Sequence, residues 1–208
     1  MSNRVVVTGA DRALGAMLCR ELARDYEIVA CGVADDTAIG CRAVDLRSQD
    51  SVEQLVAGAH AVVHTQPYDP PKATEQELLH LITRGTYVLI NAAAEAQVQR
   101  IVLISQLAVM ERYPDHFVVD PSWRPLPAAT AVSLAPYLAE LTCREIARTG
   151  KIQVICQRLG ALGAEDGTSE QDAATEVRRA LAREMTRLEH QWRVSHVVSS
   201  GCFSGVGT

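Results

Sequence analysis

The chain has 208 residues, a formal net charge of −5 at pH 7 and a hydrophobic fraction of 48%. This length suits one domain around one core. The acidic balance, with no long basic run, gives no electrostatic support for nucleic-acid binding. No apolar stretch approaches the ~20 residues that a bilayer-spanning helix needs, so we expect no membrane association. The N-terminus runs straight into a strand pattern without a signal peptide, and we therefore expect a cytoplasmic protein.

Strand patterns alternate regularly with amphipathic helix patterns along the chain. The predicted strands are Arg4–Thr8, Glu27–Cys31, Arg42–Val44, Ala61–His64, Arg100–Ser105, Gln153–Arg158 and Arg193–Val198. The predicted helices are Leu14–Arg24, Ser51–Ala57, Thr74–Ala96, Leu134–Arg148 and Ser169–Gln191. Several strands are nearly continuous apolar runs, which is typical of strands covered on both faces. The alternation predicts an α/β fold, a doubly wound parallel sheet of about seven strands with helices on both faces.

The first strand, turn and helix carry the most specific pattern. An apolar run reaches Gly9, and an amphipathic segment follows Gly15 directly. This is the geometry that holds a dinucleotide pyrophosphate in a Rossmann-like fold. The glycine expected midway between them is replaced by Arg12. Its guanidinium either binds phosphate in place of backbone contacts or points to solvent and leaves the site empty.

Several further segments, in order and spacing, resemble the extended short-chain dehydrogenases, the group similar to NAD-dependent epimerases and dehydratases. They are Thr8 to Gly15, Val44 to Arg47, His60 to His64, Gly85-Thr86 with Asn91 to Ala93, Val98 to Ser105, Tyr137 with Glu145, and Gln157 to Gly160. The resemblance implies an NAD or NADP site formed by Thr8, Gly9, Ala10, Arg12, Ala13, Leu14, Asp45 and Leu46. It places Asp45 at the adenine amino group; alternatively, Asp45 caps a turn.

The resemblance also names catalytic candidates, Tyr137 and Ser105. In this family a tyrosine acts as general acid/base, and a lysine four residues later lowers its pKa, because an unperturbed tyrosine rarely ionises at pH 7. That lysine position is Leu141 here, and the family's serine position is Gln106. The family's asparagine position falls at Ile82. The reacting groups are therefore altered although the scaffold is retained.

The family builds its substrate domain largely from segments after the sixth strand, and little such material is present here. The resemblance thus implies a single NAD(P)-binding domain over residues 1–208, with the substrate domain largely absent. Two functions follow. One is a degenerate, non-catalytic member that acts as a sensor, regulatory subunit or assembly partner. The other is an atypical NAD(P)-dependent oxidoreductase for a small carbonyl or alcohol substrate, with Tyr137 as proton donor.

Four further expectations concern surfaces and side-chain chemistry. The wide apolar faces of the helices at 74–96 and 134–148 predict a homodimer interface. The proline-rich connection from Arg112 to Ser133 is long enough to suggest a ligand-facing role, against a plain surface excursion. The six cysteines include no CxxC pair, and we expect them to be reduced and mostly buried. The residues between His60 and His64 have a strand pattern, so the two histidines do not form a helical metal pair, and no metal site is predicted.

Overall fold

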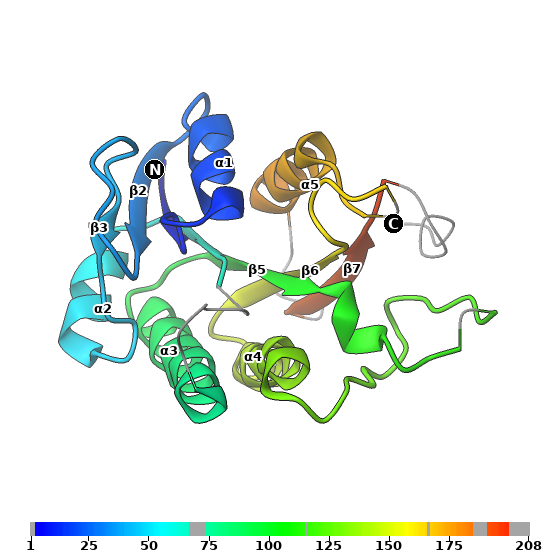
Figure 1. The fold of residues 1–208 in the computed structure, drawn as a ribbon. Helices are drawn as coiled ribbons and strands as arrows, with labels where there is room; N and C mark the ends of the chain where they lie inside the picture. Colours follow the sequence, from blue (N-terminus) through cyan, green and yellow to red (C-terminus); the bar gives the residue numbers. More distant parts are fainter. Residues whose placement is uncertain (1–2, 67–73, 115, 166, 185–190, 200–208) are drawn as a thin grey trace.

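The computed structural model describes residues 3–66, 74–114, 116–165, 167–184 and 191–199. Its centre is a seven-stranded parallel sheet with the strand order β3-β2-β1-β4-β5-β6-β7 (Figure 1). The strands are β1 (Arg4–Thr8), β2 (Glu27–Gly32), β3 (Arg42–Ala43), β4 (Ala61–His64), β5 (Arg100–Gln106), β6 (Gln153–Leu159) and β7 (Trp192–Val197). The order reverses next to β1, between β1 and β4, which is the switch point where open α/β sheets bind ligands.

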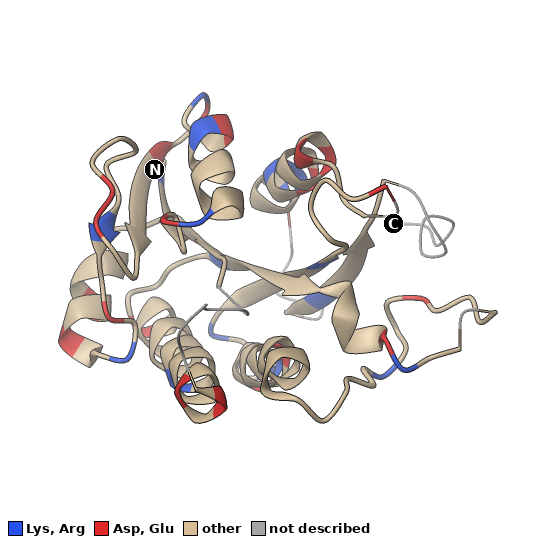
Figure 2. Ribbon diagram, viewed as in Figure 1, with Lys and Arg blue, Asp and Glu red and all other residues tan. Residues whose placement is uncertain are grey.

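Helices cover both faces of the sheet. They are α1 (Ala13–Leu22), α2 (Gln49–Val56), α3 (Glu75–Glu95), α4 (Ala131–Ala147) and α5 (Glu170–Ala182), with a 3-10 turn η1 (Leu107–Met110) after β5. Figure 1 shows α1 and α5 on one face and α2, α3 and α4 on the other. Lys and Arg lie interspersed with Asp and Glu on the outer helices α1, α3 and α5 (Figure 2). The predicted doubly wound fold is confirmed.

The period of two along β1 distributes its side chains between two cores. Val5 and Val7 pack with α1 and α5, whereas Val6 packs with α2, α3 and α4. All three are fully buried. This explains why the strand reads as an unbroken apolar run, because both of its faces meet helices.

Helix α4 buries a different face from the predicted one. The predicted stripe is half-buried at every position, Leu134, Tyr137, Leu138, Leu141 and Ile146. The fully buried stripe is made of small residues four apart, Ala131, Ala135, Ala139, Cys143 and Ala147. Small side chains let α4 approach the sheet and α3 closely, and this outweighs the larger apolar area of the leucines. The homodimer interface through α3 and α4 stays a prediction.

The last helix is shorter than predicted. It begins as expected, with Ser169 as N-cap accepting a hydrogen bond from Asp172 N (3.0 Å). It ends at Ala182 rather than Gln191, and residues 185–190 lie outside the described residues. The buried Arg100 guanidinium donates to the carbonyls of Ala180 (2.6 Å) and Leu181 (2.7 Å). A cation from β5 thus satisfies carbonyls that a longer helix would have used itself.

The cysteines that the structure describes are free and buried, as expected: Cys19, Cys31, Cys41, Cys143 and Cys156. Burial raises the pKa of the Cys31 thiol to about 12, so it stays protonated and behaves as a small apolar side chain. Cys202 lies outside the described residues. Within the described part of the chain, no helix is both long and apolar enough to cross a membrane.

Candidate functional site

The glycine turn between β1 and α1 is closely packed. Gly9 has φ +64°, and a Cβ there would lie 2.5 Å from Thr65 Oγ1. A Cβ on Gly15 would lie 2.2 Å from the carbonyl oxygen of Gly9. Only glycine therefore allows the turn to double back against α1 and the end of β4. The close packing of the turn thus explains why both positions are glycine.

The N-terminus of α1 is open toward the turn. Its N-cap, Arg12, makes no side-chain capping hydrogen bond, and the first turn carries no acidic residue. The Arg12 side chain is 46% exposed, with Nε 3.9 Å from a carboxylate oxygen of Asp11. Of its neighbours, Ala10 is buried and donates its N–H to Cys31 O (2.9 Å), and Ala13 begins the helix. Uncapped helix N–H groups and a half-exposed guanidinium are together suited to an anionic group.

Two adjoining cavities open beside this turn. The turn cavity, about 30 Å³, contains the predicted residues Thr8, Gly9 and Leu46, and is also lined by Cys31, Gly32, Val33, Val44, Thr65, Gln66, Leu81 and Ile82. The strand-end cavity, about 310 Å³, is lined by Leu14, Thr65, Gln66, Ile104, Ser105, Gln106, Leu107, Ala108 and Leu159 to Leu162. Thr65 and Gln66 border both, so the two spaces are adjacent. A group bound at the turn would lie between them.

Asp45 does not line either cavity. Its carboxylate is exposed and accepts hydrogen bonds from Arg47 Nε (2.8 Å) and Nη2 (3.0 Å). It also accepts from the backbone N–H of Arg47 (2.9 Å), which is the turn contact that the alternative interpretation predicts. The hydrogen bond from the Arg47 side chain is the main reason that the pKa of Asp45 is lowered.

A buried histidine lies directly beneath the turn. Thr8 Oγ1 donates to Thr65 O (2.8 Å), so its contact with His64 Nδ1 (2.8 Å) requires the proton on that ring nitrogen. The Nε2 atom then accepts from Thr86 Oγ1 (3.2 Å). Burial lowers the pKa of His64 to about 3, and the imidazole is neutral at physiological pH. His64 is a structural support for the turn rather than a proton donor.

Lowering the pH is expected to destabilise the fold through His64. Because its pKa is about 3 when folded and about 6.5 when unfolded, the unfolded chain binds more protons between these values. The stabilisation is complete above the unfolded pKa and is lost as the pH falls from about 6.5 toward 3. In urea unfolding at pH 7 and pH 5, His64→Gln should lose about 2 kcal/mol less over this interval than the wild type. The exposed His80→Gln variant is the control and should match the wild type.

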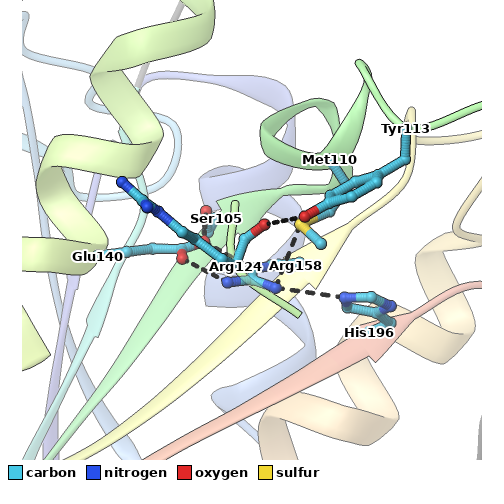
Figure 3. A network of polar contacts seen from close by, with 7 residues as sticks. All are labelled: Ser105, Met110, Tyr113, Arg124, Glu140, Arg158 and His196. Atoms are coloured by element: carbon cyan, nitrogen blue, oxygen red, sulfur yellow. Dashed lines mark hydrogen bonds and ion pairs between the residues drawn. The ribbon is translucent and has the colours of Figure 1, made fainter. Parts of the chain in front are cut away.

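A buried ion pair lies at the end of β5, where the resemblance placed the reacting groups. Ser105 Oγ donates to Glu140 Oε1 (2.6 Å), and Arg158 donates to the same carboxylate through Nε (2.9 Å) and Nη2 (2.8 Å). The two charged residues are each 3% exposed. Figure 3 shows the three side chains converging from β5, α4 and β6, with Met110 and His196 beyond Arg158. The only hydroxyl proton of Ser105 is therefore committed to Glu140.

The charges of this network are stabilised by each other. Burial lowers the pKa of Arg158, but the hydrogen bond and the charge of Glu140 outweigh it and leave that pKa above its usual value. His196 Nε2 lies 3.4 Å from Arg158 Nη1. Burial, followed by the nearby Arg158 charge, lowers the pKa of His196 to about 4. At neutral pH the group holds one cation and one carboxylate, with a neutral histidine.

The structure places the two predicted catalytic residues in different cavities. Ser105 lines the strand-end cavity. Tyr137 is half-buried and lines a third space together with Glu140 and Leu141, and it packs against Val109, Met110 and Val119. Glu140 thus links the two cavities, because it lines the cavity of Tyr137 and accepts the hydrogen bond from Ser105. Sequence reasoning missed Glu140 and Arg158, although a charged residue within an apolar strand and another on an apolar helix indicate a buried pair.

The parallel sheet, the switch point and the glycine turn define a Rossmann-type dinucleotide-binding fold. Residues 5–198 match the model of the NAD dependent epimerase/dehydratase family, and the chain belongs to that family. The resemblance inferred from the sequence is confirmed. The extent of the substrate domain stays a prediction.

The proteins to which this chain is similar include several that are named as dehydrogenases. The chain is 26% identical over 110 residues to an L-arabinose 1-dehydrogenase (NAD(P)(+)) of Haloferax volcanii, which is 53% of this chain and 43% of that protein. The match thus spans less than half of that relative. The fold is similar to a glucuronic acid dehydrogenase from Chromohalobacter salexigens (TM-score 0.81, 19% identity, 100% of this chain and 85% of that one). It is also similar to the NAD complex of a uronate dehydrogenase variant from Agrobacterium tumefaciens (TM-score 0.78, 20% identity, 94% and 77%).

Proposed function

We propose that this chain binds a nicotinamide dinucleotide through the glycine turn and has a non-catalytic role, as a sensor, regulatory subunit or assembly partner. The observation that carries the proposal is the hydrogen bond from Ser105 to Glu140 (2.6 Å), within a buried ion pair. This hydroxyl cannot donate to a substrate carbonyl while it donates to the carboxylate, since a hydroxyl has one proton.

The residue at the family's lysine position supports the same conclusion for Tyr137. The position four residues later is Leu141, which supplies no charge to stabilise a tyrosinate. The chain has two lysines; Lys151 lies just before β6, at the amino edge of the sheet, and Lys72 lies outside the described residues. A cation that would activate Tyr137 at the carboxyl edge is thus not supplied by Lys151.

The glycine turn offers good contacts for the pyrophosphate of a dinucleotide. The space beside the turn offers little room for its adenosine. The uncapped α1 N-terminus and Arg12 are placed for phosphate oxygens, and the strand-end cavity offers about 310 Å³ on the nicotinamide side. The turn cavity, at about 30 Å³, holds only a few water molecules. An adenine would have to lie across its mouth, which favours weak binding. When bound, the cofactor would supply a hydride donor or acceptor.

The runner-up function is an NAD(P)-dependent oxidoreductase. Its support is that two of the similar proteins are named as an L-arabinose 1-dehydrogenase and a glucuronic acid dehydrogenase. In this reading Tyr137 donates the proton, and Ser105 acts as a positioning residue through Glu140. Correct positioning of cofactor and substrate alone lowers a hydride-transfer barrier substantially, so catalysis without the lysine is chemically feasible.

Cofactor binding is tested by thermal unfolding with NAD, NADH, NADP and NADPH. A ligand at 100 times its Kd adds about 2.7 kcal/mol, which for this chain length is a rise of about 5–10 °C in Tm. We expect a rise with at least one cofactor, and Arg12→Gln should reduce it. Arg20→Gln, on the same helix but away from the turn, is the matched control. A wild-type Tm that none of the four changes would contradict dinucleotide binding.

Turnover separates the two functions. The proposal expects no reduced nicotinamide when the protein is incubated with NAD or NADP and either D-glucuronate or L-arabinose. Steady formation of the reduced cofactor that Tyr137→Phe abolishes would overturn the non-catalytic role and establish the oxidoreductase. Tyr87→Phe, at an exposed position of α3 far from Tyr137 in sequence, is the control for a lost hydroxyl.

A further inference from the structure

The third space, which we call the tryptophan cavity, is not used by the proposed function. Its volume is about 610 Å³, within the range of small-molecule sites. It lies between α4, the sheet edge at β6 and β7, and the connection after η1. It is lined by Pro121, Ser122, Trp123, Arg124, Pro125, Tyr137, Glu140, Leu141, Arg144, Arg158, Trp192 and Val194. Ser105 borders the strand-end cavity, so the Ser105–Glu140 hydrogen bond separates the two spaces.

The outer wall of the tryptophan cavity is held in place by contacts to the segment around η1. Tyr113 Oη donates to Arg124 O (2.8 Å), and Leu126 N donates to Val109 O (2.8 Å). The rings of Tyr113 and Trp123 pack edge to face with centroids 5.1 Å apart. A wall that is already ordered loses little conformational entropy when a ligand binds. This segment is the long connection for which the sequence predicts a ligand-facing role.

The lining carries excess positive charge in a chain whose net charge is −5. It has three arginines and one carboxylate, Glu140. Arg158 is neutralised by Glu140, and Arg144 pairs with the exposed Glu145 (3.0 Å). Arg124 has no ion pair with any residue that the structure describes. Figure 3 shows its side chain extending from the connection past Glu140 toward α4.

Apart from Ser122, the other lining residues are aromatic or apolar. Trp123, Trp192 and Tyr137 face the same space, with Leu141 and Val194. Asp120 lies beside the cavity rather than in its lining, and its carboxylate is bound by Ser122 N (2.7 Å). An exposed guanidinium next to aromatic faces binds an oxoanion on a flat apolar body, because the guanidinium fork pairs with carboxylate or phosphate and the rings cover the apolar part.

We infer that the tryptophan cavity, lined by Trp123, Arg124, Tyr137 and Trp192, binds a small organic oxoanion with a flat apolar body. The anion is a carboxylate or a phosphate monoester. The inference does not depend on dinucleotide binding, because the cavity is separate from the glycine turn.

Intrinsic fluorescence tests this site directly, because both tryptophans of the chain line it. The protein is titrated without cofactor with benzoate, phenyl phosphate and benzamide, which share a ring and differ in charge. We expect saturable quenching by at least one oxoanion, with benzamide weaker by about tenfold or more. Benzoate binding tighter than phenyl phosphate assigns a carboxylate ligand, and the reverse order assigns a phosphate ester.

Variants show whether the charge comes from Arg124. Arg124→Gln should weaken the better oxoanion about tenfold and leave the Tm unchanged, because the side chain is exposed and the backbone carbonyl makes the structural contact. Arg112→Gln, exposed and outside the cavity, should bind as the wild type. No saturable quenching by either oxoanion, equal affinity for benzamide, or unchanged affinity in Arg124→Gln would overturn the inference.

Discussion

Replacing Glu140 with glutamine is expected to cost about 3–5 kcal/mol in the free energy of unfolding. The substitution leaves the shape of the side chain but removes the charge that compensates Arg158. That guanidinium is 3% exposed and its Nε and Nη2 both donate to Glu140, so little water reaches it to compensate for the lost carboxylate. The cost is the desolvation of an unpaired cation rather than the loss of one hydrogen bond.

Urea unfolding measures this loss, and two comparisons identify its cause. Glu145→Gln, on the same helix but exposed, should cost no more than about 1 kcal/mol. The double variant Glu140→Gln with Arg158→Gln should lose less than the sum of the two single variants, because the buried site is then neutral. Additive losses would show that the two residues stabilise the fold independently and would contradict the pairing.

Gly9→Ala is expected to cost about 2–5 kcal/mol and to abolish dinucleotide binding. A left-handed backbone costs an L-residue about 1–2 kcal/mol, and overpacking adds about 1–3 kcal/mol. The new Cβ would lie 2.5 Å from Thr65 Oγ1 and 2.9 Å from Thr65 O. It would thus push apart the contact in which Thr65 Oγ1 donates to Thr8 O (2.6 Å). The turn would open at the point where phosphate is expected to bind.

Gly58→Ala is the matched control, because Gly58 has φ +69° and no heavy atom lies within 4 Å of the position that a Cβ would take. It should cost only the backbone strain, about 1–2 kcal/mol. Both values come from urea unfolding, and cofactor binding is followed by the change in Tm. Equal losses of stability in the two variants would mean that the contact with Thr65 contributes nothing.

Much of the fold could be predicted from local patterns. The seven strands and five helices appear in the predicted order, with ends that differ by a few residues in most elements. The main exception is α5, which ends at Ala182 because Arg100, about 80 residues away in sequence, takes its last carbonyls. A helix periodicity does not contain information about a cation supplied by another strand.

The site was predictable only in part. Gly9 and Gly15 were recognisable because a turn that doubles back on a helix excludes a Cβ. The resemblance placed Asp45 at the adenine, which stays a prediction, and the structure adds that its carboxylate pairs with Arg47. Tyr137 and Ser105 were named from the family resemblance, and their catalytic roles stay predictions. The structure adds that they border different cavities, which sequence spacing does not indicate.

The sequence by itself determined the doubly wound sheet, the family and the glycine turn, because these depend on periodicity and on backbone limits that act between near neighbours. Only the tertiary structure decided that Glu140 meets Arg158 and Ser105, and that both tryptophans line one cavity. The contacts of Glu140 join α4 to β5 and β6, and they follow from how closely the small residues of α4 allow the helix to approach. Such contacts are set by the close packing of whole helices and strands, and no short stretch of sequence specifies that packing.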